Sequence, residues 1–204
     1  MTGRAEKLRA AIFISGRGSN MQALIEAAQA PDYPVAIALV ISNRADAAGL
    51  EIARGYGVEA LAVPARPYGT DRDAHERAID AELAARRIDL VCLAGYMRIL
   101  TPYLVNRWAG RMLNIHPSLL PAYPGLDTHA RVLAAGEAEH GCTVHLVTAI
   151  MDDGPILAQA RVKIQQGDTE DTLAARVLAQ EHLLYPAALA RFAPTLLPEP
   201  TANP

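Results

Sequence analysis

The chain has 204 residues, of which 51% are hydrophobic and 20% charged, so it can bury the core of one domain. The net charge is −3 and no run of lysine or arginine stands out, which argues against nucleic acid as the main partner. The apolar run at residues 10–14 is too short for a signal peptide core or a membrane span, so we expect a soluble, cytoplasmic protein without a membrane partner. We expect one domain over residues 1–193, followed by a proline-rich tail over 194–204.

Strand and helix patterns alternate over the first half of the chain. Ser19 or Asn20 can cap the first helix. Thr70–Asp73 resembles a capping box, and Thr101–Pro102 offers a capping hydroxyl before a proline at the first helical position. Continuous apolar runs are typical of strands covered on both faces, and they predict strands at residues 11–15, 35–41, 60–63, 88–94 and 112–115.

The alternation stops after the fifth strand. Residues 142–147 and 156–164 predict two more strands, whose short connection suits only antiparallel neighbours. A final helix is expected from about Glu170 to Phe192, with Pro186 bending or interrupting it. The pattern predicts an α/β fold: a single-domain, Rossmann-like open sheet, mostly parallel with antiparallel strands toward the C-terminal part, and helices on both faces.

The most informative segment is Asn114–Pro121, at the end of the fifth predicted strand. Asn114 and His116 are two residues apart, so both side chains project from one face of the strand, and Pro117 ends that strand. An amide donor beside a titratable imidazole can stabilise an oxyanion and move a proton. On the sequence alone, Asn114 could equally cap a turn beside an ordinary strand-end histidine.

The segment Ser15–Asn20 follows the first strand and opens the first helix. Its glycines let an anion approach the positive end of the helix, which favours a phosphate site over a simple tight turn. It is an incomplete dinucleotide fingerprint, because Met21 stands where the third glycine belongs and no acidic residue ends the second strand.

Two carboxylate features have both a structural and a functional interpretation. Asp152 or Asp153 could bring a carboxylate to the imidazole of His116, although most aspartates in such connections only form turns. Glu181 falls on an apolar helical stripe, where a carboxylate is costly unless it is paired. It could bind a cationic group or a sugar, pair with an arginine, or lie at a solvent-open edge.

His140, Cys142 and His145 are of the residue types that bind zinc, but their spacing does not suit a zinc site. On a strand, the first two share a face and His145 lies on the other, so we predict no metal site. His145 could instead face the cleft beside the catalytic residues.

These motifs occur together in a known family. The chain carries, in order, the glycine loop at 15–20, then Leu93–Leu100, Asn114–Pro121 and Asp152 near Gly154–Pro155. Over about residues 11–192 it resembles the folate-dependent formyltransferases. The glycine loop and the compact length resemble the phosphoribosylglycinamide formyltransferases within that group.

The resemblance implies transfer of the formyl group of 10-formyltetrahydrofolate to the amine of phosphoribosylglycinamide in de novo purine biosynthesis. It implies small-molecule substrates, a monomer or homodimer, and no metal. It also implies direct attack, with the oxyanion stabilised by Asn114 and His116 and with Asp152 assisting proton transfer. By carry-over, the ribonucleotide site comprises Gly18, Ser19, Asn20 and Glu181. The folate site comprises Arg72, Met97, Arg98, Ile99, Leu100, Asn114, Thr148, Ala149, Ile150, Met151 and Asp152.

One position departs from the family pattern. Family members usually have Asp-Gly-Gly-Pro where this chain has Asp152-Asp153-Gly154-Pro155. We expect the extra carboxylate of Asp153 to alter the conformation or the charge of the folate loop.

Two alternatives keep the folate and change the acceptor. A formyltetrahydrofolate hydrolase uses water and would carry an additional N-terminal domain, whereas another N-formyltransferase acts on charged tRNA and would carry a basic C-terminal domain. The sequence favours neither, with about ten residues before the first strand and nothing basic after the last helix. A nucleotide-cofactor oxidoreductase or a non-catalytic nucleotide-binding domain is a third alternative, which would require NAD(P) binding without folate binding.

Overall fold

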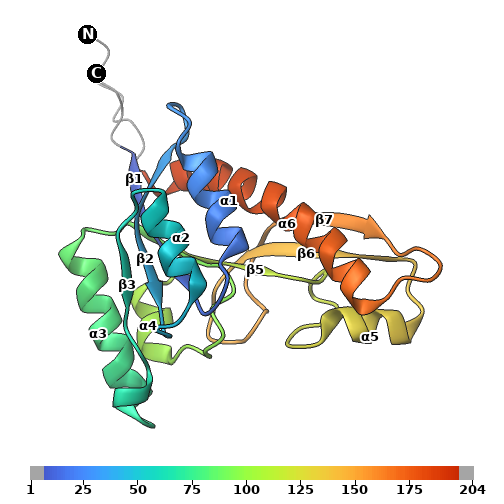
Figure 1. Cartoon of the computed structure of the whole chain (residues 1–204), viewed down its shortest axis with the longest axis horizontal. Helices are drawn as coiled ribbons and strands as arrows, with labels where there is room; N and C mark the ends of the chain where they lie inside the picture. Colours follow the sequence, from blue (N-terminus) through green and yellow to red (C-terminus); the bar gives the residue numbers. More distant parts are fainter. Residues whose placement is uncertain (1–6, 198–204) are drawn as a thin grey trace, which may run out of the picture.

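Seven strands form one sheet in the order β3-β2-β1-β4-β5-β6-β7 in the computed structural model, which describes residues 7–197 (Figure 1). The first five strands are parallel, and β6 and β7 are antiparallel to their neighbours. The strands are β1 (Leu8–Ile14), β2 (Val35–Ser42), β3 (Ala60–Ala62), β4 (Leu90–Leu93), β5 (Met112–His116), β6 (Glu139–Leu146) and β7 (Ile156–Lys163). The predicted mostly parallel sheet with antiparallel C-terminal strands is confirmed.

Helices cover both faces of the sheet, as predicted. Leu24 of α1, Leu50 of α2 and Leu173 of α6 belong to the hydrophobic core on one face. Ile79 of α3 and Leu104 of α4 belong to the core on the other. The helices are α1 (Ser19–Ala28), α2 (Ala48–Gly55), α3 (Arg72–Ala85), α4 (Pro102–Arg107), α5 (Thr128–Ala135) and α6 (Glu170–Phe192), with short 3₁₀ helices at Arg66–Tyr68 and Ala193–Leu196.

Two predicted helix starts need correction. Neither Ser19 nor Asn20 caps α1, because its N-cap is Gly18, in a left-handed conformation (φ 74°) and without a side-chain cap. The cap of α3 is Asp71 rather than Thr70, and its carboxylate accepts a hydrogen bond from the backbone N–H of Ala74. Both errors are shifts of one or two residues at a helix boundary, where several neighbouring residues can act as the cap.

The C-terminal half differs from the prediction in three places. The helix α5 was not predicted, and with eight residues it offers only two buried positions, Thr128 and Val132, as a signal. It packs at the far end of the molecule from β3, beside α6 (Figure 1). Strand β6 begins at Glu139 rather than at residue 142. Helix α6 continues through Pro186, so this proline does not interrupt the helix, which was one of its two expected effects. The 3₁₀ helix that follows includes the first residues of the predicted tail, and residues 198–204 of the tail lie outside the described residues.

The order of the strands determines where a ligand can bind. From β1 the chain adds β2 and β3 on one side, and it then returns to place β4 on the other side of β1. In open sheets of this kind, the crevice at such a reversal lies outside the carboxyl ends of the strands. Ser15, Asn43 and Ala94 directly follow β1, β2 and β4 and therefore meet at this edge.

None of the helices in the described part of the chain combines the length and the apolar character that crossing a bilayer requires.

Candidate active site

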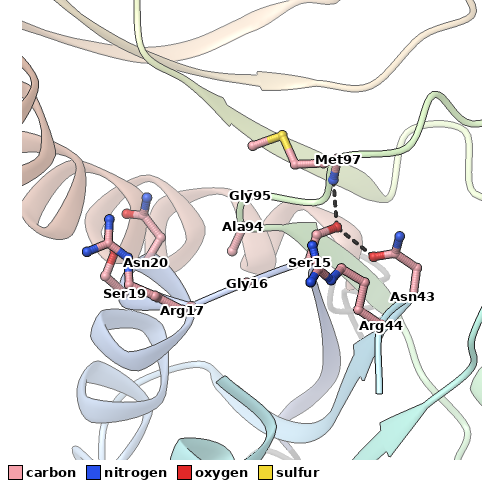
Figure 2. A pocket seen from close by; sticks show the side chains of 11 residues that line it. Ser15, Gly16, Arg17, Ser19, Asn20, Asn43, Arg44, Ala94, Gly95 and Met97 are labelled. Atoms are coloured by element: carbon pink, nitrogen blue, oxygen red, sulfur yellow. Dashed lines mark hydrogen bonds between the residues drawn. The ribbon is translucent and has the colours of Figure 1, made fainter. Parts of the chain in front are cut away.

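The first cavity, which we call the glycine-loop cavity, opens at the carboxyl ends of β1, β2 and β4 (Figure 2). It encloses about 510 Å³. The structure brings together here Gly18, Ser19 and Asn20, the three loop residues expected to bind a phosphate. The remaining lining residues are Ser15, Gly16, Arg17, Asn43, Arg44, Ala94, Gly95 and Met97.

Ser15, which follows β1, forms hydrogen bonds with the segments that follow β2 and β4. Its hydroxyl donates to Asn43 Oδ1 at 2.6 Å and accepts from the backbone N–H of Met97 at 2.8 Å (Figure 2). Its own N–H donates to the carbonyl of Gly95. Sequence reasoning did not select Ser15 or Asn43 as site residues. The available signal was a polar residue directly after an apolar strand in a predicted parallel sheet.

The second cavity, the strand-end cavity, encloses about 520 Å³ beside the first. The two cavities share Gly95 and Met97. Its walls come from the turn after β4, the end of β5, residues 125–128 and residues 147–152. Ten residues of the expected folate site line it: Met97, Arg98, Ile99, Leu100, Asn114, Thr148, Ala149, Ile150, Met151 and Asp152.

Arg72 is the exception among the expected folate residues. It does not line the strand-end cavity. Its guanidinium donates instead to the carbonyl of Ile99, so it binds the backbone of a segment that does line the cavity.

Asn114, Ile115 and His116 all line the strand-end cavity, and Ile115 also belongs to a hydrophobic core. The side chains of Asn114 and His116 instead approach His145 and Asp152, two polar groups that are themselves 3.7 Å apart. The predicted common orientation of Asn114 and His116 is therefore confirmed. It follows from the two-residue periodicity of β5.

His145 lies opposite Asn114 on β6, and the two side chains meet. Asn114 Nδ2 is 3.2 Å from His145 Nε2, and His145 Nδ1 is 2.9 Å from the carbonyl of Leu146. A carbonyl only accepts, so Nδ1 carries the hydrogen, and in the neutral ring Nε2 accepts from the amide of Asn114. Burial lowers the pKa of His145, which favours the neutral ring.

Asp152 lies between the two histidines. Its Oδ2 is 3.5 Å from His116 Nδ1, and its Oδ1 is 3.7 Å from His145 Nε2. The backbone N–H of Gly125 donates to Oδ2 at 2.9 Å and holds the carboxylate in place. On its other side, the ring of His116 has Nε2 3.1 Å from the carbonyl of Tyr123. We refer to Asn114, His116, His145 and Asp152 as the polar cluster.

The two aspartates of the β6–β7 connection differ in position and in backbone conformation. Asp152 lines the strand-end cavity and adopts a left-handed backbone conformation (φ 54°). Asp153 is exposed, does not line the cavity and is not among the residues with positive φ. A Cβ on Gly154 would lie 1.7 Å from the carbonyl oxygen of Leu146, so the packing of the loop requires glycine at 154. The effect expected of Asp153 on the conformation or the charge of the folate loop stays a prediction.

Glu181 is buried and pairs with the glycine loop. Its Oε2 accepts a 2.7 Å hydrogen bond from Asn20 Nδ2, which lines the glycine-loop cavity. Burial raises the pKa of Glu181, and the hydrogen bond from Asn20 partly offsets this rise. Neither an arginine partner nor a solvent-open position accounts for this carboxylate, because its partner is an amide and only 6% of the residue surface is exposed.

His140 is also buried, and it pairs with His129 of α5. His140 Nε2 lies 3.0 Å from His129 Nδ1, and burial lowers the pKa of His140 to about 4. No group of three or more histidines, cysteines, aspartates or glutamates within residues 7–197 is placed to hold a metal ion.

Known proteins resemble this chain in sequence and in fold. Residues 8–189 match the family model described as formyl transferase. Over 182 residues the chain is 47% identical to the phosphoribosylglycinamide formyltransferase of Escherichia coli (strain K12), an alignment that covers 89% of this chain and 85% of the relative. A crystal structure of phosphoribosylglycinamide formyltransferase from Brucella melitensis superimposes with a TM-score of 0.88 and 53% identity, covering 92% of this chain and 96% of that one.

Some relatives are much longer. The chain is 46% identical over 184 residues to the trifunctional purine biosynthetic protein adenosine-3 of Bos taurus. That alignment covers 90% of this chain but 18% of the relative, so the chain spans less than a fifth of its length.

Proposed function

The chain belongs to the phosphoribosylglycinamide formyltransferases of purine biosynthesis, and we propose how its two cavities divide the reaction. The acceptor, phosphoribosylglycinamide, binds in the glycine-loop cavity. The donor, 10-formyltetrahydrofolate, binds in the strand-end cavity. Because the cavities share Gly95 and Met97, the acceptor amine reaches the formyl group at their junction.

The N-terminus of α1 is suited to the phosphate of the acceptor. Its first turn has no side-chain cap and no acidic residue, so its backbone N–H groups are available to an anion. The buried pair of Asn20 and Glu181 stands beside this turn and supplies acceptors for the hydroxyl groups of a sugar.

The strand-end cavity is suited to a planar ring system with polar edges. Its wall contains large apolar side chains that are exposed without a ligand, namely Met97, Ile99, Leu126, Ile150 and Met151. A bound ring would remove this surface from water. The backbone of residues 148–152 offers hydrogen-bonding groups to the ring edge. In this arrangement the folate supplies the formyl group, and Arg72 holds the segment that contains Ile99.

The polar cluster performs the transfer. The neutral amine of the acceptor attacks the formyl carbon, and negative charge develops on the formyl oxygen. One hydrogen of the Asn114 amide is occupied by His145, and the other is available to this oxygen. His116 supplies the second donor when the formyl oxygen replaces the Tyr123 carbonyl as the acceptor of its Nε2 hydrogen. Asp152 stabilises the positive charge on His116 and receives the proton that the attacking nitrogen loses, which then passes to the departing folate nitrogen.

His145 acts as a positioning residue in this account. Nε2 of its neutral ring accepts a hydrogen bond from Nδ2 of Asn114 and so fixes the orientation of the Asn114 amide. The second hydrogen of Nδ2 then points to the reacting oxygen. It does not need to touch either substrate to do so.

The observation that carries the proposal is the placement of Asn114, His116 and Asp152 in one cavity directly beside the glycine loop. The test is transfer of a ¹³C-labelled formyl group from 10-formyltetrahydrofolate, followed by NMR. We expect the label in the amide of formylglycinamide ribonucleotide. Label recovered as free formate with the acceptor present would contradict the proposal and indicate a hydrolase.

A further inference from the structure

The glycine-loop cavity contains two arginines, and only one of them is already paired. Arg17 and Arg44 are the charged residues among those that line it. In Figure 2 they flank the loop, Arg17 on the side of Ser19 and Arg44 on the side of Asn43. Arg44 forms two hydrogen bonds with Asp46, of 3.0 and 2.8 Å, which neutralise its charge.

Arg17 has no such partner. Within residues 7–197 its guanidinium makes no hydrogen bond and no ion pair, and the side chain is exposed at the cavity. The carboxylate of this region, Glu181, is already bonded to Asn20. The cavity therefore carries one positive charge that nothing in the described structure compensates.

A second observation indicates that the cavity takes a polar ligand. Asn20 is 9% exposed and lines the cavity, and its Oδ1 is buried without any hydrogen-bond partner. An unpaired buried acceptor is costly and is satisfied when a ligand supplies an N–H or O–H group. A ligand that carries both an anion and such donors would satisfy Arg17, the first turn of α1 and Asn20 together.

We propose that Arg17 is a phosphate-binding residue, which closes over the phosphate of the acceptor from the side opposite the backbone of α1. This assignment rests on the proposed function, and it adds a side chain to the backbone groups of Gly18, Ser19 and Asn20. A guanidinium can donate two parallel hydrogen bonds to phosphate oxygens. Since Arg17 does not line the strand-end cavity that contains the polar cluster, we expect its effect to be on binding rather than on the chemical step.

The first experiment compares two acceptors in two proteins. Wild type and Arg17→Gln are assayed with phosphoribosylglycinamide and with the corresponding nucleoside, which lacks the phosphate. We expect Arg17→Gln to lower kcat/KM about tenfold for the phosphorylated acceptor through KM, and to change it less than about twofold for the nucleoside. The KM for the folate should be unchanged. Equal losses with both acceptors, or no loss with either, would overturn the assignment.

Two further variants separate charge from other causes. Arg17→Lys keeps the charge and should recover part of the lost affinity. Arg161→Gln removes one positive charge on β7, where Arg161 pairs with Glu139 outside both cavities, and should behave as wild type. A loss in Arg161→Gln equal to that in Arg17→Gln would attribute the effect to net charge and contradict the proposal.

Calorimetric titration with ribose 5-phosphate distinguishes this assignment from the proposed function. If Arg17→Gln weakens its binding about tenfold while wild type formylates no phosphoribosylglycinamide, Arg17 binds phosphate and the proposed acceptor is wrong. If wild type formylates the acceptor normally and Arg17→Gln changes neither binding nor KM, the proposed function holds and the Arg17 assignment is wrong.

Discussion

Asn114 Nδ2 lies 3.2 Å from His145 Nε2, across the antiparallel pair of β5 and β6. The contact depends on the register that places the two residues directly opposite each other. It also depends on the carbonyl of Leu146, which accepts a hydrogen bond from His145 Nδ1–H, so that Nε2 of the neutral ring can accept a hydrogen bond from Asn114. A backbone carbonyl thus fixes the tautomer of the His145 ring, and this ring orients the amide that we propose stabilises the oxyanion.

Replacing His145 should therefore lower turnover without weakening substrate binding. In His145→Phe the amide of Asn114 loses its acceptor and can rotate, so we expect kcat to fall about ten- to a hundredfold. The KM values of both substrates should stay within about threefold of wild type. His145→Gln offers an amide oxygen as an alternative acceptor and should retain more activity than His145→Phe. Steady-state kinetics of the two variants tests this.

The pH profile supplies a readout that a purely structural role would not change. Protonation of His145 in acid removes the acceptor of Asn114, so wild-type kcat should decline as the ring becomes charged. That ring faces Asn114, Asp152 and the Leu146 carbonyl, with His116 nearby. His145→Gln should lose the part of the acid decline that belongs to this ring. An unchanged acid limb would mean that His145 does not act through Asn114.

His116 and Asp152 are predicted to be essential for the chemical step. His116→Ala and Asp152→Asn should fold, and each should lower kcat by about a hundredfold or more, the usual cost of losing such a group. Asp153→Asn provides the matched control, because Asp153 is exposed and outside the cavity. If Asp153→Asn loses as much turnover as Asp152→Asn, the roles of the two neighbouring aspartates are wrongly assigned.

Gly154 and Asp153 should respond in opposite ways to substitution. The Cβ of Gly154→Ala would lie 1.7 Å from the Leu146 carbonyl oxygen, so the loop must move and carry Asp152 away from His116. We expect a loss of about 1–3 kcal/mol of unfolding free energy and a large loss of kcat. Asp153→Gly restores the residue that the family pattern usually has and should leave kcat nearly unchanged. Denaturant unfolding and steady-state kinetics of both variants test these expectations. Wild-type unfolding free energy and kcat in Gly154→Ala would contradict the packing argument.

His140 should make the stability of the fold depend on pH. Its pKa is about 4 in the folded protein and near 6.5 when unperturbed, because the ring is buried against His129. Between these two values the unfolded chain binds more protons than the folded one. The stabilisation is therefore complete above pH 6.5 and is lost as the pH falls toward 4, by up to about 3 kcal/mol.

The measurement is urea unfolding of wild type and His140→Gln across that pH range. His140→Gln should show a shallower decline of unfolding free energy toward acid. Parallel pH dependences in the two proteins would show that His140 is not responsible. The remaining slope in the variant reports the other groups, of which His129 also has a pKa lowered by burial.

Local patterns were sufficient for most of the fold. The buried parallel strands appear in the sequence as continuous apolar runs, and α6 begins and ends at the predicted residues Glu170 and Phe192. Helix α5 was missed because it has only eight residues, so its buried positions, Thr128 and Val132, complete a single four-residue spacing and give a weak pattern. The caps of α1 and α3 were misplaced by one or two residues, since cap chemistry alone does not fix a boundary.

The geometry of the site could be predicted only where it depends on the spacing of residues within a single strand. Asn114 and His116 share a face because they are two residues apart in β5. The partners of the site depend on contacts between different elements of the fold: Asn114 with His145 across two strands, Asn20 with Glu181 between two helices, and Ser15 with Asn43 between two strand ends. Each pair joins residues that are 28 or more positions apart, and no spacing within the sequence encodes such a contact.

The most direct test of the account is the absorbance of the deformylated folate released from a 10-formyl folate analogue, with and without phosphoribosylglycinamide. The account predicts release by the wild-type protein only when the ribonucleotide is present, and almost none by Asp152→Asn. Release that does not require the ribonucleotide, or wild-type rates in Asp152→Asn, would contradict it.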